Sequence, residues 1–136
     1  MPTSQEKIEA FLASKRFAVV GASQDRSKYG NKVLRVYMQN DRDVVPVNPT
    51  ATEVEGLMAY RDLASIPGTI DAVSIITPPP VTERVVQDAI QRGIKQIWMQ
   101  PGAESQKAIK AAEAAGASVI ASGPCILVSL RYHEHD

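Results

Sequence analysis

Five short apolar runs alternate along the chain with stretches of helical periodicity, and this alternation constrains the fold more than any other feature. The first run, residues 17–20, is unbroken, which is typical of a strand buried on both faces of a parallel sheet. Apolar residues at three- and four-residue spacing between the runs indicate amphipathic helices. We expect an α/β fold, with a mostly parallel sheet of five or six strands and helices on both faces. The expected strands are 17–20, 44–47, 72–76, 94–99 and 118–121, and the helices lie around 8–12, 29–37, 81–90 and 105–115.

Size and charge exclude several classes of protein. The length of 136 residues corresponds to one domain, so we expect residues 1–136 to form a single unit. Fifteen basic residues balance fifteen acidic ones, so no broad positive field can hold nucleic acid or a membrane, and any anion site must be local. The one cysteine cannot form an internal disulfide, and Glu6 and Glu9 interrupt any apolar leader. These features predict a cytoplasmic protein.

A turn of small residues follows the first expected strand and leads into a helix. Small residues let backbone N–H groups approach a phosphate, and a helix N-terminus adds partial positive charge. The alternative is a tight strand-to-helix turn without a ligand, since the spacing is not that of a GxGxxG motif. The candidate ligand-binding residues here are Gly21, Ala22, Ser23, Lys28, Tyr29 and Gly30.

The second expected strand ends in Val47, Asn48 and Pro49. NAD-binding domains usually carry an acidic residue there, which binds the ribose hydroxyls. Asn48 lacks that charge, which disfavours NAD and suits a nucleotide whose ribose carries a phosphate, while Pro49 offers a flat apolar surface. The alternative for Asn48 is an Asx turn that leaves the strand. Because Pro46 cannot donate a ladder hydrogen bond, this strand either ends there or lies near a sheet edge.

The third and fourth expected strands add candidates at the same edge. Thr77 and Pro78 follow the third strand, where prolines without N–H groups make an apolar, stiff rim that suits an adenine or a pantetheine arm. The alternative is a rigid turn before a proline-primed helix. Gln100 follows the fourth strand and adds an amide, whereas Trp98 belongs in the core or an interface. Residues 50–69 are expected to be irregular.

No catalytic or metal-binding set stands out. No Ser/His/Asp or Cys/His set is recognisable, and no pair of carboxylates can be singled out. The only histidines, His133 and His135, lie in a tail expected to be solvated, and two exposed imidazoles without a second cluster predict no metal site. Cys125 lies near the expected ligand edge and is either a small buried residue or a reactive thiol.

Taken together, these segments resemble the small stand-alone CoA-binding proteins. Their Rossmann-like domain is similar to the N-terminal domain of the succinyl-CoA synthetase α subunit. The resemblance covers roughly residues 8–128 and rests on the order and spacing of the motifs rather than on any single one. The matching segments are Ala18–Ser23, Lys28–Gly30, Val45–Pro49, Glu55-Gly56, Asp71–Val73, Pro78-Pro79, Ile97–Gln100 with Gly102, and Cys125.

The resemblance implies that coenzyme A, free or acylated, lies across the carboxyl edge of the sheet. The turn from Gly21 to Ser23, with Lys28, would take the pyrophosphate. Residues 47–49 would lie against the adenosine, and Thr77 and Pro78 would line the pocket wall. Many relatives carry a lysine after the Asn-Pro pair and an arginine before the prolines. This chain has neither, so the positive charge that would face the 3′-phosphate is reduced.

The resemblance also frames the function. We expect a non-catalytic CoA-binding protein, because the phosphate-carrying histidine of succinyl-CoA synthetase belongs to other domains. Three alternatives stay open: a CoA-using subunit that needs a catalytic partner, an NAD(P)-binding regulator or oxidoreductase, and a pure protein-interaction domain. A mixed disulfide between Cys125 and the CoA thiol is a further hypothesis.

Overall fold

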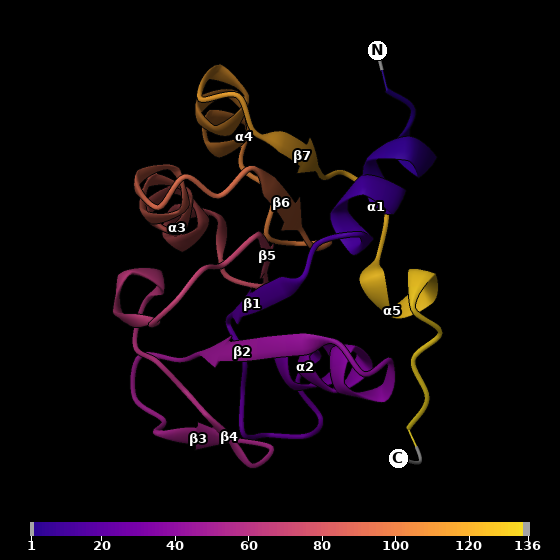
Figure 1. Ribbon diagram of the computed structural model, residues 1–136, viewed down its shortest axis with the longest axis vertical. Helices are drawn as coiled ribbons and strands as arrows, with labels where there is room; N and C mark the ends of the chain where they lie inside the picture. Colours follow the sequence, from indigo (N-terminus) through magenta and orange to yellow (C-terminus); the bar gives the residue numbers. More distant parts are fainter. Residues whose placement is uncertain (1, 135–136) are drawn as a thin grey trace.

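The structure is a computed structural model that describes residues 2–134, and a five-stranded parallel sheet in the order β2-β1-β5-β6-β7 runs through it (Figure 1). A second, two-stranded sheet pairs β3 with β4. The elements are α1 (Ser4–Leu12), β1 (Arg16–Val20), α2 (Tyr29–Gln39), β2 (Asp43–Val47), β3 (Glu53–Val54), β4 (Leu57–Met58), the short 3₁₀ helix η1 (Leu63–Ser65), β5 (Ala72–Ile75), α3 (Pro79–Gln91), β6 (Gln96–Met99), α4 (Gln106–Ala114), β7 (Ser118–Ile120) and α5 (Ile126–Ser129).

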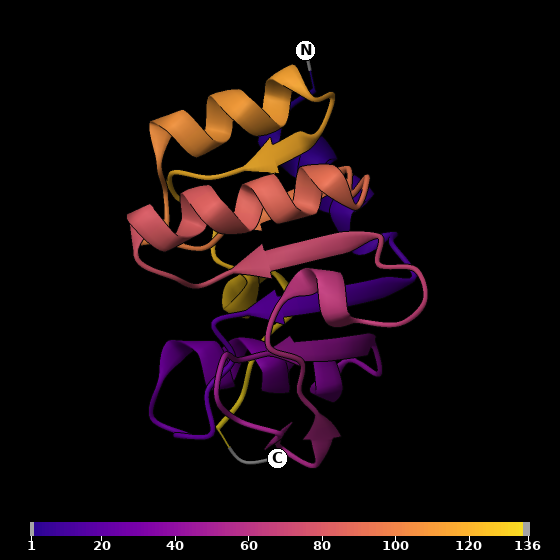
Figure 2. The same ribbon diagram turned by 90° about the vertical axis from the view of Figure 1, so that its left-hand side faces the viewer.

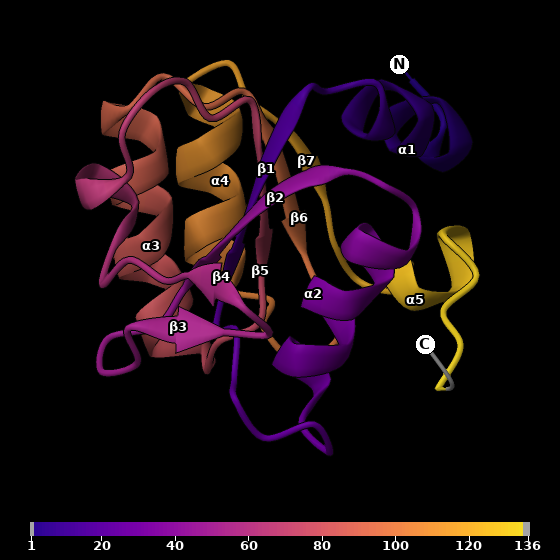
Figure 3. The same cartoon turned by 60° about the horizontal axis from the view of Figure 1, so that its bottom comes forward.

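Helices cover both faces of the five-stranded sheet, as the alternation of strands and helices predicts. Helices α3 and α4 lie on one face, while α1, α2 and α5 lie on the other (Figure 3). Alternate residues of β1 pack into the hydrophobic cores on opposite faces of the sheet. Ala18 packs on the face covered by α3, whereas Phe17 and Val19 pack on the face covered by α2. Trp98 is fully buried, as expected, and its Nε1 donates to the Pro124 carbonyl at 3.0 Å.

Local sequence explains where the helices begin. Thr3 and Glu6 form a reciprocal capping box at the start of α1. Pro79 occupies the first turn of α3, where a missing N–H costs nothing. The Ser105 side chain accepts from the Ala108 N–H and caps α4. In the described part of the chain, none of the helices is long and apolar enough to cross a membrane.

The edge position of the second strand is confirmed. Strand β2 is the outermost strand beside β1, and Pro46 pairs in register with Val19. On its outer side the Pro46 carbonyl accepts a hydrogen bond from the Tyr60 N–H at 3.1 Å, and the Tyr60 carbonyl accepts from the Asn48 N–H at 2.9 Å. The segment after the hairpin therefore covers an edge that would otherwise be open to pairing.

Three expectations need correction. Residues 50–69 are not wholly irregular, since they contain the β3–β4 hairpin and η1. The strand expected at 94–99 begins only at Gln96. The tail is more than solvated: His133 and Glu134 are exposed, but side-chain and backbone contacts dock the tail on α2 as far as Glu134. Helix α5, which the periodicity did not predict, brings the chain back against α2 (Figure 1).

Candidate functional site

The carboxyl ends of β1 and β5 mark a switch point in the sheet. The chain leaves β1 through α2 on one face and leaves β5 through α3 on the opposite face, so the two loops diverge (Figures 2 and 3). Ligands of open α/β sheets bind in the crevice at such a point. A cavity of about 310 Å³ lies there, lined by Val20, Gly21, Val47, Pro49, Arg61, Asp62, Leu63, Thr77, Val81, Arg84, Val85 and Asp88.

Two glycines allow the turn after β1 to pass close to its neighbours. Gly21 has a φ of 99°, and a β-carbon there would overlap the Ile76 carbonyl oxygen and lie 2.8 Å from its carbon. Gly30, in the first turn of α2, faces Gly21 so closely that a β-carbon would overlap the Gly21 carbonyl oxygen. Both positions therefore exclude any side chain, which fixes the approach of α2 to the sheet edge.

The N-terminus of α2 leaves backbone donors available. Its N-cap residue, Lys28, is exposed and makes no capping bond through its side chain. The Asp25 carboxylate instead accepts from the Ser27 N–H at 2.9 Å and the Ser27 hydroxyl at 2.7 Å. These bonds hold the pKa of Asp25 below its ordinary value and keep its charge within the turn. The first turn of α2 thus presents free N–H groups beside a lysine, which suits an anion.

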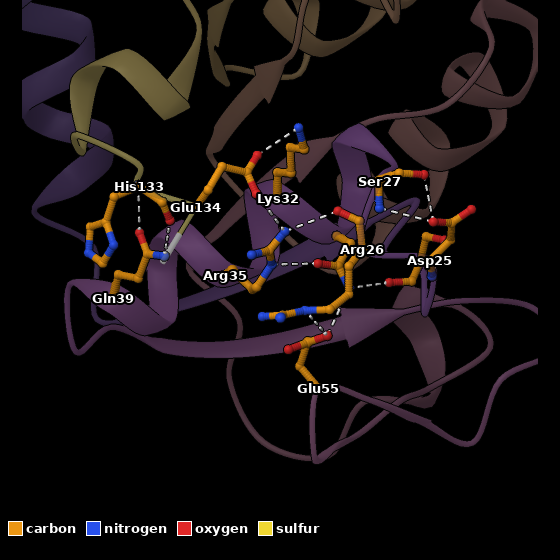
Figure 4. Close-up of polar contacts among 11 residues, drawn as sticks. Asp25, Arg26, Ser27, Lys32, Arg35, Gln39, Glu55, His133 and Glu134 are labelled. Carbon is orange, nitrogen blue, oxygen red and sulfur yellow. Dashed lines mark hydrogen bonds and ion pairs between the residues drawn. The ribbon is translucent and has the colours of Figure 1, made fainter. Parts of the chain in front are cut away.

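Two buried side chains of α2 hold the carbonyl groups of the turn inward (Figure 4). The Asn31 Nδ2 donates to the Ser23 carbonyl at 2.8 Å and to Glu55 Oε2 at 3.1 Å. The Arg35 Nε donates to Asn31 Oδ1 at 2.7 Å, and its Nη2 donates to the Arg26 carbonyl at 3.0 Å. Because a trans peptide directs its N–H away from its carbonyl, the N–H that follows Ser23 turns outward.

The docked tail completes this network around Arg35. The Glu134 carboxylate lies 2.9 Å from Lys32 Nζ and 3.8 Å from Arg35 Nη2, and the Arg35 guanidinium lies 5.3 Å from the ring centre of Tyr132. Gln39 and the His133 backbone exchange two hydrogen bonds (Figure 4). The Lys32 ammonium lowers the pKa of Glu134, so the tail keeps its negative charge opposite the buried arginine.

Asn48 forms the Asx turn, one of the two readings left open for it. Its Oδ1 accepts from the N–H groups of Thr50 at 2.9 Å and Ala51 at 2.8 Å. Its Nδ2 donates to the Ala22 carbonyl at 2.8 Å, so the loop after β2 is tied to the loop after β1. The Asn48 side chain therefore positions the two loops, and its neighbours Val47 and Pro49 line the cavity.

Tyr29 and Gln100 meet on the α2 face rather than in the cavity. The Tyr29 hydroxyl lies 3.1 Å from Gln100 Oε1 and 2.7 Å from the Cys125 sulfur, and burial raises the pKa of this tyrosine. The Ile126 N–H also donates to Gln100 Oε1, while Gln100 Nε2 is buried without a partner in the described part of the chain. Cys125 is half-buried, and its part in a mixed disulfide stays a hypothesis.

The structure groups the predicted residues into three places. Gly21, Val47, Pro49 and Thr77 line the cavity, and Pro78 joins Thr77 in a shallower depression beside it. Ala22, Ser23, Lys28 and Gly30 form the turn and helix start, while Tyr29 and Gln100 lie behind it. Sequence reasoning missed the charged residues of the cavity, Arg61, Asp62, Arg84 and Asp88, because they lie on an expected irregular segment and on a polar helix face.

Metal binding has no support within residues 2–134, where no three His, Cys, Asp or Glu side chains gather to hold an ion. His133 uses its backbone N–H to bond Gln39. His135 lies outside the described residues, so nothing structural bears on the His-x-His pair.

Comparisons with known proteins point to one family. A family model described as a CoA binding domain matches residues 15–131. An uncharacterized Bacillus subtilis protein, YneT, is 29% identical over 119 residues, which is 88% of each chain. The α subunit of an ADP-forming acetate–CoA ligase II from Pyrococcus furiosus is 30% identical over 91 residues, and the match covers 66% of this chain but only 20% of that subunit.

Solved structures agree with the architecture. A conserved hypothetical protein from Pyrococcus furiosus superimposes with a TM-score of 0.80 at 38% identity, covering 85% of this chain and 99% of that one. A hypothetical protein from Pyrococcus horikoshii gives a TM-score of 0.89 at 31% identity, covering 96% of this chain and 91% of that one. The Rossmann-like α/β fold predicted from the sequence is thereby confirmed.

Proposed function

Because the chain belongs to the CoA-binding domain family, we propose that it binds coenzyme A, free or acylated, at the carboxyl edge of its sheet and catalyses no reaction alone. One observation carries the proposal most strongly. The glycine turn after β1 presents a helix N-terminus without a side-chain cap beside a cavity with an apolar floor. An anionic pyrophosphate and an apolar purine need these two environments side by side.

The residues present fit the two halves of the ligand. Free N–H groups of the α2 first turn and Lys28 provide donors and charge for the pyrophosphate. Val47 and Pro49 give the cavity an apolar wall against which the adenosine would lie. Asn48 holds the loops of β1 and β2 together through Ala22, so the two subsites keep their spacing.

The likeness to the acetate–CoA ligase subunit supports a second candidate, a CoA-using subunit that needs a catalytic partner. This chain spans a fifth of that subunit's length. Incubation of the isolated chain with CoA, ATP and acetate should leave CoA unchanged by mass spectrometry. Formation of acetyl-CoA by the chain alone would contradict the non-catalytic proposal.

Thermal unfolding with added nucleotides tests the proposal. A ligand at a hundred times its dissociation constant stabilises the folded state by about 2.7 kcal/mol, which raises the melting temperature of a domain this size by several degrees. We expect about 1 mM CoA to give such a rise, whereas NAD at the same concentration should give none, since Asn48 replaces the acidic residue that binds the NAD ribose. Stabilisation by NAD alone would favour the dinucleotide alternative, and no response to CoA would contradict the proposal.

A further inference from the structure

The cavity beside Gly21 combines an apolar floor with a charged rim. Its volume of about 310 Å³ lies at the lower end of the range for small-molecule sites, so it holds part of a nucleotide rather than all of CoA. The floor and inner wall are made by Val20, Val47, Leu63, Val81 and Val85. The rim carries two cations and two anions, and their partners determine which charge is available to a ligand.

Arg84 is the available cation. It projects from α3 at the rim and is exposed, and its side chain makes no ion pair or hydrogen bond within residues 2–134. Arg92, at the other end of α3, is by contrast engaged, because it donates to the carbonyls of Leu63 and Ile66. A guanidinium that is free at a cavity rim can form two parallel bonds to a phosphate without giving up a protein partner.

The two anions of the rim also differ in whether a protein partner occupies them. Asp62 accepts from Ser65 at 2.7 Å, which lowers its pKa, and it lies 3.6 Å from the exposed Arg61. Asp88 follows Arg84 by one helical turn and forms no ion pair within residues 2–134. The rim is therefore balanced overall, but a phosphate placed at Arg84 would sense Asp88 as its nearest uncompensated negative neighbour on α3.

The position of the cavity indicates which phosphate would meet Arg84. Gly21 belongs both to the turn and to the cavity lining, so a ligand whose pyrophosphate lies on the turn has its ribose directed into the cavity. Lys28 and the α2 N-terminus lie on the turn and do not line the cavity. The cations at the cavity rim, Arg61 and Arg84, are therefore placed to bind a substituent on the ribose rather than the pyrophosphate.

We propose that Arg84, assisted by Arg61, binds the ribose 3′-phosphate of CoA and makes this protein prefer CoA to dephospho-CoA. The proposal rests on the proposed function. The chain has the uncharged residues Thr50, Ala51 and Thr77 where many relatives carry a lysine or an arginine. The positive charge for the third phosphate would come instead from Arg84 in the second turn of α3 and from Arg61 before η1.

Titration calorimetry with CoA and dephospho-CoA tests the assignment. The unmodified protein should bind CoA at least about tenfold more tightly, the effect of one charge-assisted hydrogen bond. Arg84→Gln keeps a good helix former on α3 and should bring the ratio of the two dissociation constants close to one without weakening dephospho-CoA binding. Asp88→Asn should move the ratio the other way, because it removes negative charge beside the phosphate. Arg131→Gln is the matched control, since Arg131 is exposed and does not line the cavity.

The outcomes distinguish the assignment of Arg84 from the proposal that the protein binds CoA. If the unmodified protein binds CoA and dephospho-CoA equally, the assignment of Arg84 is wrong while the CoA-binding proposal stands. Equal weakening of both ligands by Arg84→Gln would place Arg84 against the pyrophosphate or the adenine and would also overturn it. Failure of both ligands to bind the unmodified protein would overturn the proposed function itself.

Discussion

Replacing Gly30 by alanine should destabilise the protein by about 3 kcal/mol and abolish CoA binding, although alanine is the better helix former. Helix propensity alone would favour the substitution by about 1 kcal/mol. The added methyl group, however, would overlap the Gly21 carbonyl oxygen and lie 2.9 Å from the carbonyl carbon. Since neither atom belongs to a flexible side chain, α2 or the turn must shift, and the overlap outweighs the propensity gain.

Urea unfolding of Gly30→Ala, with calorimetry for CoA, measures both effects. Gly56→Ala is the control, because Gly56 has a φ of 81° but a β-carbon there meets nothing within 4 Å. It should cost about 1–2 kcal/mol, the strain of a left-handed residue, and leave CoA affinity unchanged. A Gly30→Ala protein that is more stable than the parent would show that α2 does not approach the turn this closely.

Arg35→Met is expected to destabilise the fold by about 2–4 kcal/mol, because removing one partner from a buried polar network leaves the others unpaired. The Arg35 side chain is 2% exposed. It donates hydrogen bonds to Asn31 Oδ1 and the Arg26 carbonyl, and it forms an ion pair with Glu134. Methionine fills much of the same volume but offers no donor, so the loss is electrostatic rather than steric.

The same change should loosen the turn from Gly21 to Lys28. Amide exchange in the turn is expected to accelerate, and CoA affinity should fall because binding must then order the segment. Lys32→Met, which removes the half-buried partner of the exposed Glu134 carboxylate, should leave exchange and binding near those of the parent. Unchanged stability and exchange in Arg35→Met would show that the network does not support the turn.

The sequence predicted the sheet because short apolar runs alternate with helical stretches. It predicted the helices from Val33, Val36 and Tyr37 or from Val85 and Ala89. It missed the β3–β4 hairpin for a physical reason. The two strands have two residues each, and the tight turn uses Glu55 with a φ of 51° before Gly56, where asparagine or aspartate is the usual signal.

The candidate site was predictable in part. Small residues after β1 and the residues at the strand ends identified the turn and four of the twelve residues that line the cavity, since carboxyl ends of parallel strands share one edge. The cavity rim was not predictable, because Arg61 and Arg84 meet only through the packing of η1 against α3. The docked tail was missed because Glu134 looks solvated until a buried arginine lies opposite it.

Nitrogen-15 NMR titration with CoA tests the central claim most directly, because it reports on each backbone N–H. We expect the largest shifts at Ala22, Ser23, Tyr29 and Gly30, with a second group at residues 47, 48, 50, 51 and 77, and little change near α4 and β7. Downfield movement of the Tyr29 and Gly30 amide protons would match hydrogen bonding to the pyrophosphate. Saturable binding with shifts clustered elsewhere, or no response in the turn, would contradict a CoA site at this edge of the sheet.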